Sequence, residues 1–224
     1  MTMNSIMETV CSVCNNVRSK SKHGVSFQNL LTMLRREFRD HGFDIKLKSD
    51  RRKSLGVEEF YVNAYYDAED DQNNETPIEV VVHHNFEKQS VWDQKHTTDL
   101  LIQIFDATVH EYKHQRQSKK RKHIVYSNHD KSPYDAYLSD PDEIDAYAIS
   151  IAIELCRNLG KYRTLRYMPK FQTLGRLKFN EKYVSPQLAA YFGQFNDLTH
   201  PVLRILAKKV YIRLMKVDTD FIFM

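Results

Sequence analysis

The chain has 224 residues, enough for one domain of ordinary size with a hydrophobic core. Apolar residues make up 42% and charged residues 28%, with only 6 Gly and 6 Pro, which excludes disordered and fibrous proteins. A net charge of +4 is too small to indicate nucleic-acid binding by itself. No stretch is as apolar as a membrane helix, and no signal-peptide pattern opens the chain, so we expect a cytoplasmic protein without membrane contact.

The first half of the chain predicts one helix followed by a small sheet. Apolar residues recur at intervals of three and four after Ser26, which predicts a helix that Ser26 caps and Gly42 ends. Three short segments rich in β-branched or aromatic residues follow, at 43–47, 60–66 and 78–83, and they predict a mostly antiparallel sheet. The last segment suits equally an edge strand that pairs with an extended substrate and a core strand.

The second half is predicted to be helical. The clearest helix runs from Trp92 to about Gln117 without Gly or Pro, and a polar loop is expected from Gln115 to Pro133. A further helix is expected from Pro141 to Leu159, since Pro and acidic residues fill its first turn and Gly160 closes it. Two more are expected, one opened by Ser185-Pro186 and one over Pro201–Lys216. We therefore expect an N-terminal segment (1–25), a core (26–160) and a mainly helical extension packed on that core (161–224).

The predicted helix that starts near Trp92 carries the sequence His110-Glu111-x-x-His114. Residues four apart lie on the same face of a helix, so His110 and His114 can direct two imidazoles at one ion. In zinc hydrolases with this HExxH pattern, the two histidines bind zinc and the glutamate takes a proton from water. The motif therefore predicts a zinc site with Glu111 as the general base.

A catalytic zinc site needs a third protein ligand and one open position. Glu143 is the strongest candidate, because it lies early in the next predicted helix, which a helix-loop-helix turn can bring back to the metal. Acidic residues also occur in first helical turns merely to complement the helix dipole. The alternatives are other acids of that turn, histidines of the preceding loop and, as support for a ligand, an acid one turn before the motif: Asp142 and Asp145, His123 and His129, and Asp106.

These residues resemble the gluzincin branch of zincin metallopeptidases, which carries HExxH on one helix and a glutamate ligand on the next. The pattern Glu143, Ala146, Tyr147, Ala148 is similar to that of minimal gluzincins, phage-encoded members included. The order helix, sheet, HExxH helix and glutamate helix also matches, over Ser26 to Gly160. The resemblance implies an α+β, zincin-like fold, bound Zn²⁺ and a protein or peptide substrate.

A peptidase also needs a hydrogen-bond donor for the tetrahedral oxyanion, often Tyr or His in this class. The side chains nearest to the motif that can serve are Tyr134, Tyr137, Tyr147 and His129. Residues beyond 160 have no counterpart in the resemblance.

Two other functions stay open. One is a non-catalytic structural or interaction protein, associated with a virion, that keeps a metallopeptidase fold. The other is a DNA-associated protease, because basic residues cluster at Arg51–Lys53, Lys113–His123 and Lys161–Lys178. The cysteines point to neither, since the Cys11-x-x-Cys14 pair lacks a second pair of zinc ligands and three cysteines form no disulfide framework.

Overall fold

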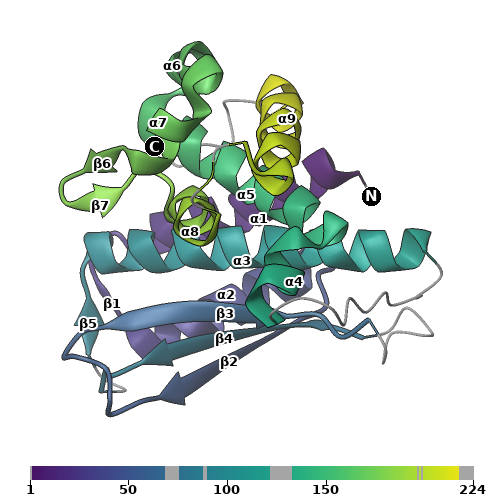
Figure 1. The fold of residues 1–224 in the computed structure, drawn as a ribbon. Helices are drawn as coiled ribbons and strands as arrows, with labels where there is room; N and C mark the ends of the chain where they lie inside the picture. The colour runs from purple at the N-terminus through teal and green to yellow at the C-terminus, as the bar shows by residue number, and fades with distance from the viewer. Residues whose placement is uncertain are drawn as a thin grey trace. The chain divides into compact units, whose positions relative to one another are not determined.

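The computed structural model describes residues 2–68, 76–87, 90–121, 133–195, 197 and 199–216. The chain divides into two compact units, residues 1–125 and 126–224, and each is described by itself. The first combines three helices with short strands, and the second is mainly helical (Figure 1). The predicted α+β class is confirmed.

The first unit contains a three-stranded sheet of β2 (Ile45–Arg51), β3 (Phe60–Tyr65) and β4 (Ile78–His84). Their order is β2-β4-β3, with β2 parallel and β3 antiparallel to β4. The predicted strand 78–83, which suited an edge position and a core position equally, is therefore the central strand β4. β1 (Val25–Ser26) and β5 (Val91–Trp92) form a second, antiparallel pair, so the sheets are mostly antiparallel, as predicted.

The first expected strand was placed too early in the chain. β2 begins at Ile45 and continues through Lys48, Ser49 and Asp50, which lack an apolar pattern. All seven of its residues pair in register with β4, ending with Arg51 opposite His84. Pairing with a buried central strand thus overrides local composition.

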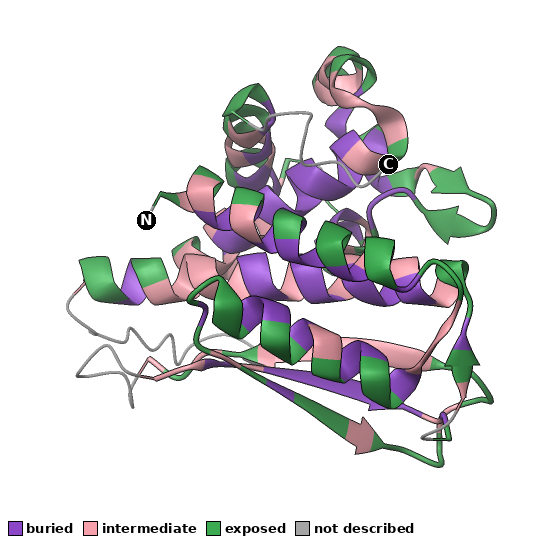
Figure 2. Ribbon diagram, turned by 180° about the vertical axis from the view of Figure 1, so that it is seen from behind, coloured by how far each residue is buried: buried purple, intermediate pink, exposed green. Residues whose placement is uncertain are grey.

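Three helices lie on one side of this sheet (Figures 1 and 2): α1 (Met3–Lys20), α2 (Phe27–Asp40) and α3 (Gln94–Lys120). α2 starts as predicted, because the Ser26 side chain accepts a hydrogen bond from the amide of Asn29. α2 packs on β2, α3 packs on β3 and β4, and α1 packs on both helices. α1 was not expected at this length, although it buries seven residues.

The second unit is built around α5 (Pro141–Leu159), which buries eleven residues. α9 (Pro201–Lys216) packs along α5, and α8 (Pro186–Gln194) also contacts it. These three helices were predicted. The remaining elements were not: α4 (Pro133–Ser139), α6 (Lys161–Tyr167), the 3₁₀ helix η1 (Met168–Lys170), α7 (Phe171–Arg176) and the hairpin β6 (Lys178–Phe179) with β7 (Lys182–Tyr183).

The loop predicted for Gln115–Pro133 is wrong at its beginning, because α3 continues to Lys120. Gln117 and Ser118 are buried although they are polar, so burial sustains the last turns of the helix. Residues 122–132 of the predicted loop lie outside the described residues.

Candidate metal site

The HExxH motif lies in the second half of α3. The Asp93 side chain caps this helix by accepting a hydrogen bond from the amide of His96, 2.8 Å away. The buried face of α3 carries Leu100, Leu101, Ile104, Phe105, Thr108 and Val109. Burial of that face fixes the rotation of the helix and leaves the motif residues half-buried on an adjoining face.

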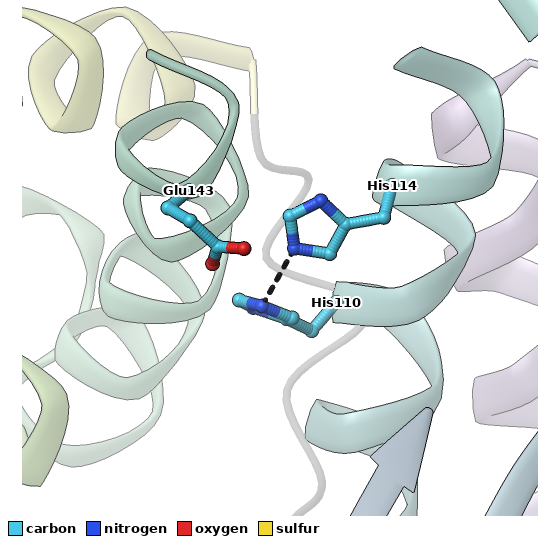
Figure 3. A group of neighbouring side chains, drawn as sticks. All are labelled: His110, His114 and Glu143. Atoms are coloured by element: carbon cyan, nitrogen blue, oxygen red, sulfur yellow. Dashed lines mark hydrogen bonds between the residues drawn. The ribbon is translucent and has the colours of Figure 1, made fainter. Parts of the chain in front are cut away.

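The two imidazoles of the motif converge. The Nε2 atoms of His110 and His114 lie 3.0 Å apart, and the rings are inclined at 68° (Figure 3). Two nitrogens that bind one zinc ion at tetrahedral angles are separated by about 3.3 Å. A change of a few tenths of an ångström therefore converts this pair into two ligands of one ion.

Glu143 lies in the first turn of α5. That turn begins at Pro141, and the Asp140 side chain caps it by accepting a hydrogen bond from the amide of Asp142 at 2.7 Å. Potential ligand atoms of His110, His114 and Glu143 all lie within 4.8 Å of one another, and all three residues are half-buried (Figure 3). Among the described residues, no other group of histidines, cysteines and acids could hold a metal ion.

The donor set suits zinc. Two imidazole nitrogens and one carboxylate oxygen match the ligands of hydrolytic zinc sites, which keep a fourth position open. Half-burial of the three side chains leaves them accessible to water. These residues therefore fit a zinc ion by donor chemistry and by convergence.

The alternative ligands are not in this group. Asp145 binds Arg213 at 2.6 Å and Lys209 at 3.5 Å, so its carboxylate is directed toward α9. Asp142 and Asp106 do not join the group, nor does Glu111, which is half-buried directly after His110. His123 and His129 lie outside the described residues.

Two of the four residues named as oxyanion donors lie together near Glu143. The hydroxyl oxygens of Tyr137 on α4 and Tyr147 on α5 are 3.2 Å apart. Tyr137 also forms a hydrogen bond with Glu143. Burial raises the pKa of Tyr137, and the negative charge of Glu143 raises it further, so this hydroxyl stays protonated at neutral pH. By solvent-accessible surface Tyr137 is 41% exposed, and the third tyrosine, Tyr134, is 50% exposed.

Tyr191 on α8 was not singled out from the sequence. It is fully buried, its ring centroid lies 5.5 Å from that of Tyr147, and its hydroxyl has no hydrogen-bond partner among the described residues. Burial raises its pKa, and Tyr147 and Glu143 add to the effect. Its spacing with Leu188 and Phe192 indicated only an apolar helix face, so no sequence signal pointed to the site.

The cysteines are structural. Cys11, Cys14 and Cys156 are buried and none forms a disulfide bond. Burial raises the pKa of the Cys156 thiol to about 11. The thiol of Cys156 is therefore protonated at neutral pH and unsuited to catalysis.

No model of a known protein family matches the chain, and neither a curated protein nor a solved structure is significantly similar to it. No helix within the described ranges is long and apolar enough to cross a membrane. The group on α3 and α5 is therefore the feature of this protein that bears on function.

Proposed function

We propose that this protein is a zinc-dependent metallopeptidase of the gluzincin type, with a zincin-like fold. The observation that supports the proposal is the convergence of His110, His114 and Glu143 to within 4.8 Å. An HExxH pattern alone predicts two ligands and a base. The carboxylate of the following helix adds the third ligand that a hydrolytic site requires.

Each residue has a distinct role in this proposal. His110 and His114 bind the metal through their neutral Nε2 atoms, and Glu143 binds through one carboxylate oxygen. Bound zinc supplies Lewis acidity, which polarises the scissile carbonyl and lowers the pKa of a water to about 7. The Glu111 carboxylate takes the proton from that water and passes it to the leaving amine.

Tyr137 orients Glu143 through their hydrogen bond. The ordered carboxylate then costs less entropy when it binds the ion. An oxyanion donor is also required, and the residues that can supply one are Tyr134, Tyr137, Tyr147 and His129.

The sheet offers one edge for an extended substrate beside the motif helix. β4 is central, whereas β3 is an edge strand and packs against α3. Extended peptides bind by adding a strand to such an edge. We therefore propose that the substrate main chain pairs with β3, in place of the strand Ile78–His83 considered from the sequence.

The test is metal content and hydrolysis in the full chain. Wild-type protein purified without chelators should hold about one zinc per chain, and combined His110→Ala and His114→Ala substitutions should remove it. Glu143→Ala should weaken binding, whereas Asp145→Asn, its matched control on the same helix, should not. A wild-type chain without bound zinc, or a double variant that retains it, would refute the proposal.

Glu111→Gln separates an enzyme from a scaffold. It should keep zinc but lower the rate of cleavage of a casein or peptide-library substrate by about 10²- to 10⁴-fold, because the general base is lost. An unchanged rate in this variant contradicts the enzyme proposal. Zinc without hydrolysis in the wild type supports a virion-associated or other interaction protein.

A further inference from the structure

Residues 155–180 form a strongly basic segment of the second unit. Residues 155–180 contain seven basic side chains and no acidic one. Removing these seven from the chain's 33 basic side chains leaves 26, against 29 acidic ones. The other 198 residues are therefore net negative as a whole, although residues 113–123 form a second basic run.

Within this segment, α6 and η1 bring three cations and two tyrosines to one face. Positions 162, 163, 166, 167 and 170 follow the three- and four-residue spacing of a single helix face. They line a surface cavity of about 620 Å³: Tyr162, Arg163, Arg166, Tyr167 and Lys170. The outer side of α6 is exposed or half-buried, as the green and pink colouring in Figure 2 shows. This set is called the α6 face below.

The opposite side of α6 anchors it. Thr164 is fully buried, and its hydroxyl donates to the carbonyl oxygens of Leu155 at 3.1 Å and Gly160 at 2.9 Å. Gly160 has a φ of 79°, which lets the chain turn from α5 into α6. The α6 face is thus held on a well-packed helix, so little ordering is needed on binding.

The cations of the α6 face are available to an external anion. Arg163, Arg166 and Lys170 are exposed, and none forms a salt bridge within the described residues. Exposed basic side chains commonly pair with acids of the same surface. The absence of acids between residues 155 and 180 removes that possibility within the segment.

The two tyrosines of the α6 face indicate an anion that also carries flat rings. Tyr162 is 88% exposed, next to Arg163 and one turn from Arg166. Such a ring buries almost no apolar surface in its own fold, so packing does not explain it. Rings interleaved with cations are the pattern by which proteins stack unpaired bases and neutralise the adjoining phosphates.

We propose that the α6 face binds single-stranded nucleic acid. Arg163, Arg166 and Lys170 contact successive phosphates, and Tyr162 stacks on a base, with Tyr167 beside it. A duplex keeps its bases stacked inside and offers Tyr162 no ring to cover, so single strands bind more tightly. The seven residues of α6 span about 10 Å, which suits two or three nucleotides.

The test is fluorescence anisotropy of the full chain with a labelled 20-nucleotide oligo(dT) and with a 20-base-pair duplex. The wild type should bind the single strand more tightly than the duplex. Combined Arg163→Gln, Arg166→Gln and Lys170→Gln should lower affinity at least tenfold at 50 mM salt. They should also reduce the slope of log affinity against log salt by about 2, because three phosphate contacts are lost.

Tyr162 separates stacking from charge. Tyr162→Ala should lower affinity about 5- to 100-fold with an unchanged salt slope, and Tyr162→Phe should retain it, because the ring remains. The matched control replaces three exposed cations of α9, in the same unit, and should change affinity less than twofold: Arg204→Gln, Lys208→Gln and Lys216→Gln.

Three outcomes would overturn this assignment. The first is a wild type that does not bind the oligonucleotide, and the second is an α9 control that loses as much affinity as the triple variant of the α6 face. The third is a wild type that binds poly-glutamate more tightly than oligo(dT). The last would identify acidic proteins as the ligand. Binding is measured without substrate or added metal, and none of the substituted residues is a zinc ligand. Its result is therefore independent of the peptidase proposal.

Discussion

The hydroxyl oxygens of Tyr137 and Tyr147 lie 3.2 Å apart and join α4 to α5 beside Glu143. Since Tyr137 also hydrogen-bonds Glu143, removing its hydroxyl should disorder the carboxylate. We predict that Tyr137→Phe lowers zinc affinity by about 10- to 100-fold, the usual effect of losing a group that orients a metal ligand. Competition with a fluorescent chelator measures this affinity.

The control for this prediction is Tyr134→Phe, since Tyr134 lies on the same helix and is similarly exposed, at 50% against 41% for Tyr137. It should leave zinc affinity unchanged. Equal affinities in Tyr137→Phe and the wild type would show that the hydrogen bond does not position the ligand. A fall in turnover without a fall in affinity would assign Tyr137 to the oxyanion instead.

Asp145 should affect stability and not metal binding. Its carboxylate pairs with Arg213 at 2.6 Å and Lys209 at 3.5 Å, and these contacts join α5 to α9. Because the carboxylate is only 17% exposed, Asp145→Asn should lower the free energy of unfolding by about 1–2 kcal/mol. Chemical denaturation measures the change. In the Asp145→Asn background, Arg213→Gln should lower the free energy of unfolding by less than it does in the wild type, because the two residues interact.

Gly175 on α7 should not tolerate a side chain. A Cβ at this position would lie 1.9 Å from Cδ2 of Phe192, a buried ring on α8. Gly175→Ala should therefore destabilise the protein by about 1–3 kcal/mol, the usual cost of overpacking. Thermal unfolding measures the loss. Adding Phe192→Leu should recover part of it, and a double variant less stable than both single ones would contradict the steric explanation.

The stability of the first unit should fall in mild acid because of His84. This side chain is 6% exposed, and its ring packs at a tilt against Phe27 with the ring centroids 4.3 Å apart. Burial lowers its pKa below the usual 6.5, and Arg51 adds to the effect. Below pH 6.5, His84 of the unfolded chain therefore binds a proton that His84 of the folded chain does not. The free energy of unfolding decreases as the pH is lowered, until the pH reaches the pKa of His84 in the folded chain.

Urea denaturation at pH 7.5, 6.5 and 5.5 measures this dependence. His84→Phe keeps an aromatic ring in the cluster and should flatten the dependence, whereas His23→Gln, at an exposed position, should leave it unchanged. A His84→Phe variant with the same pH dependence as the wild type would assign the effect to other groups.

The sequence predicted those parts of the fold that local chemistry specifies. Ser26 and Ser185 cap the helices that they were expected to cap, and α5 ends at Gly160 as expected. The central position of β4 could not be predicted, because strand order depends on contacts between distant segments. The short helices α4, α6 and α7 were not predicted for a related reason. Helices of that length are stabilised by tertiary packing and not by the helix propensity of their residues.

The same distinction applies to the site. His110 and His114 could be paired from their spacing, because the helix repeat fixes their separation. Glu143 could be named only as one of several acids, and the exclusion of Asp145 required knowledge of α9. Tyr191 could not be found at all, since its neighbours come from other helices.

The length of α5 sets a spacing within the second unit. Glu143 lies in its first turn, and α6 follows its last residue after Gly160. Sixteen residues of helix rise separate Glu143 from Leu159, which is about 24 Å. Gly160 then ends the helix before α6 begins. If both proposals hold, a nucleic-acid strand bound at α6 and a peptide bond cleaved beside Glu143 would lie at opposite ends of α5, about 24 Å apart along its axis.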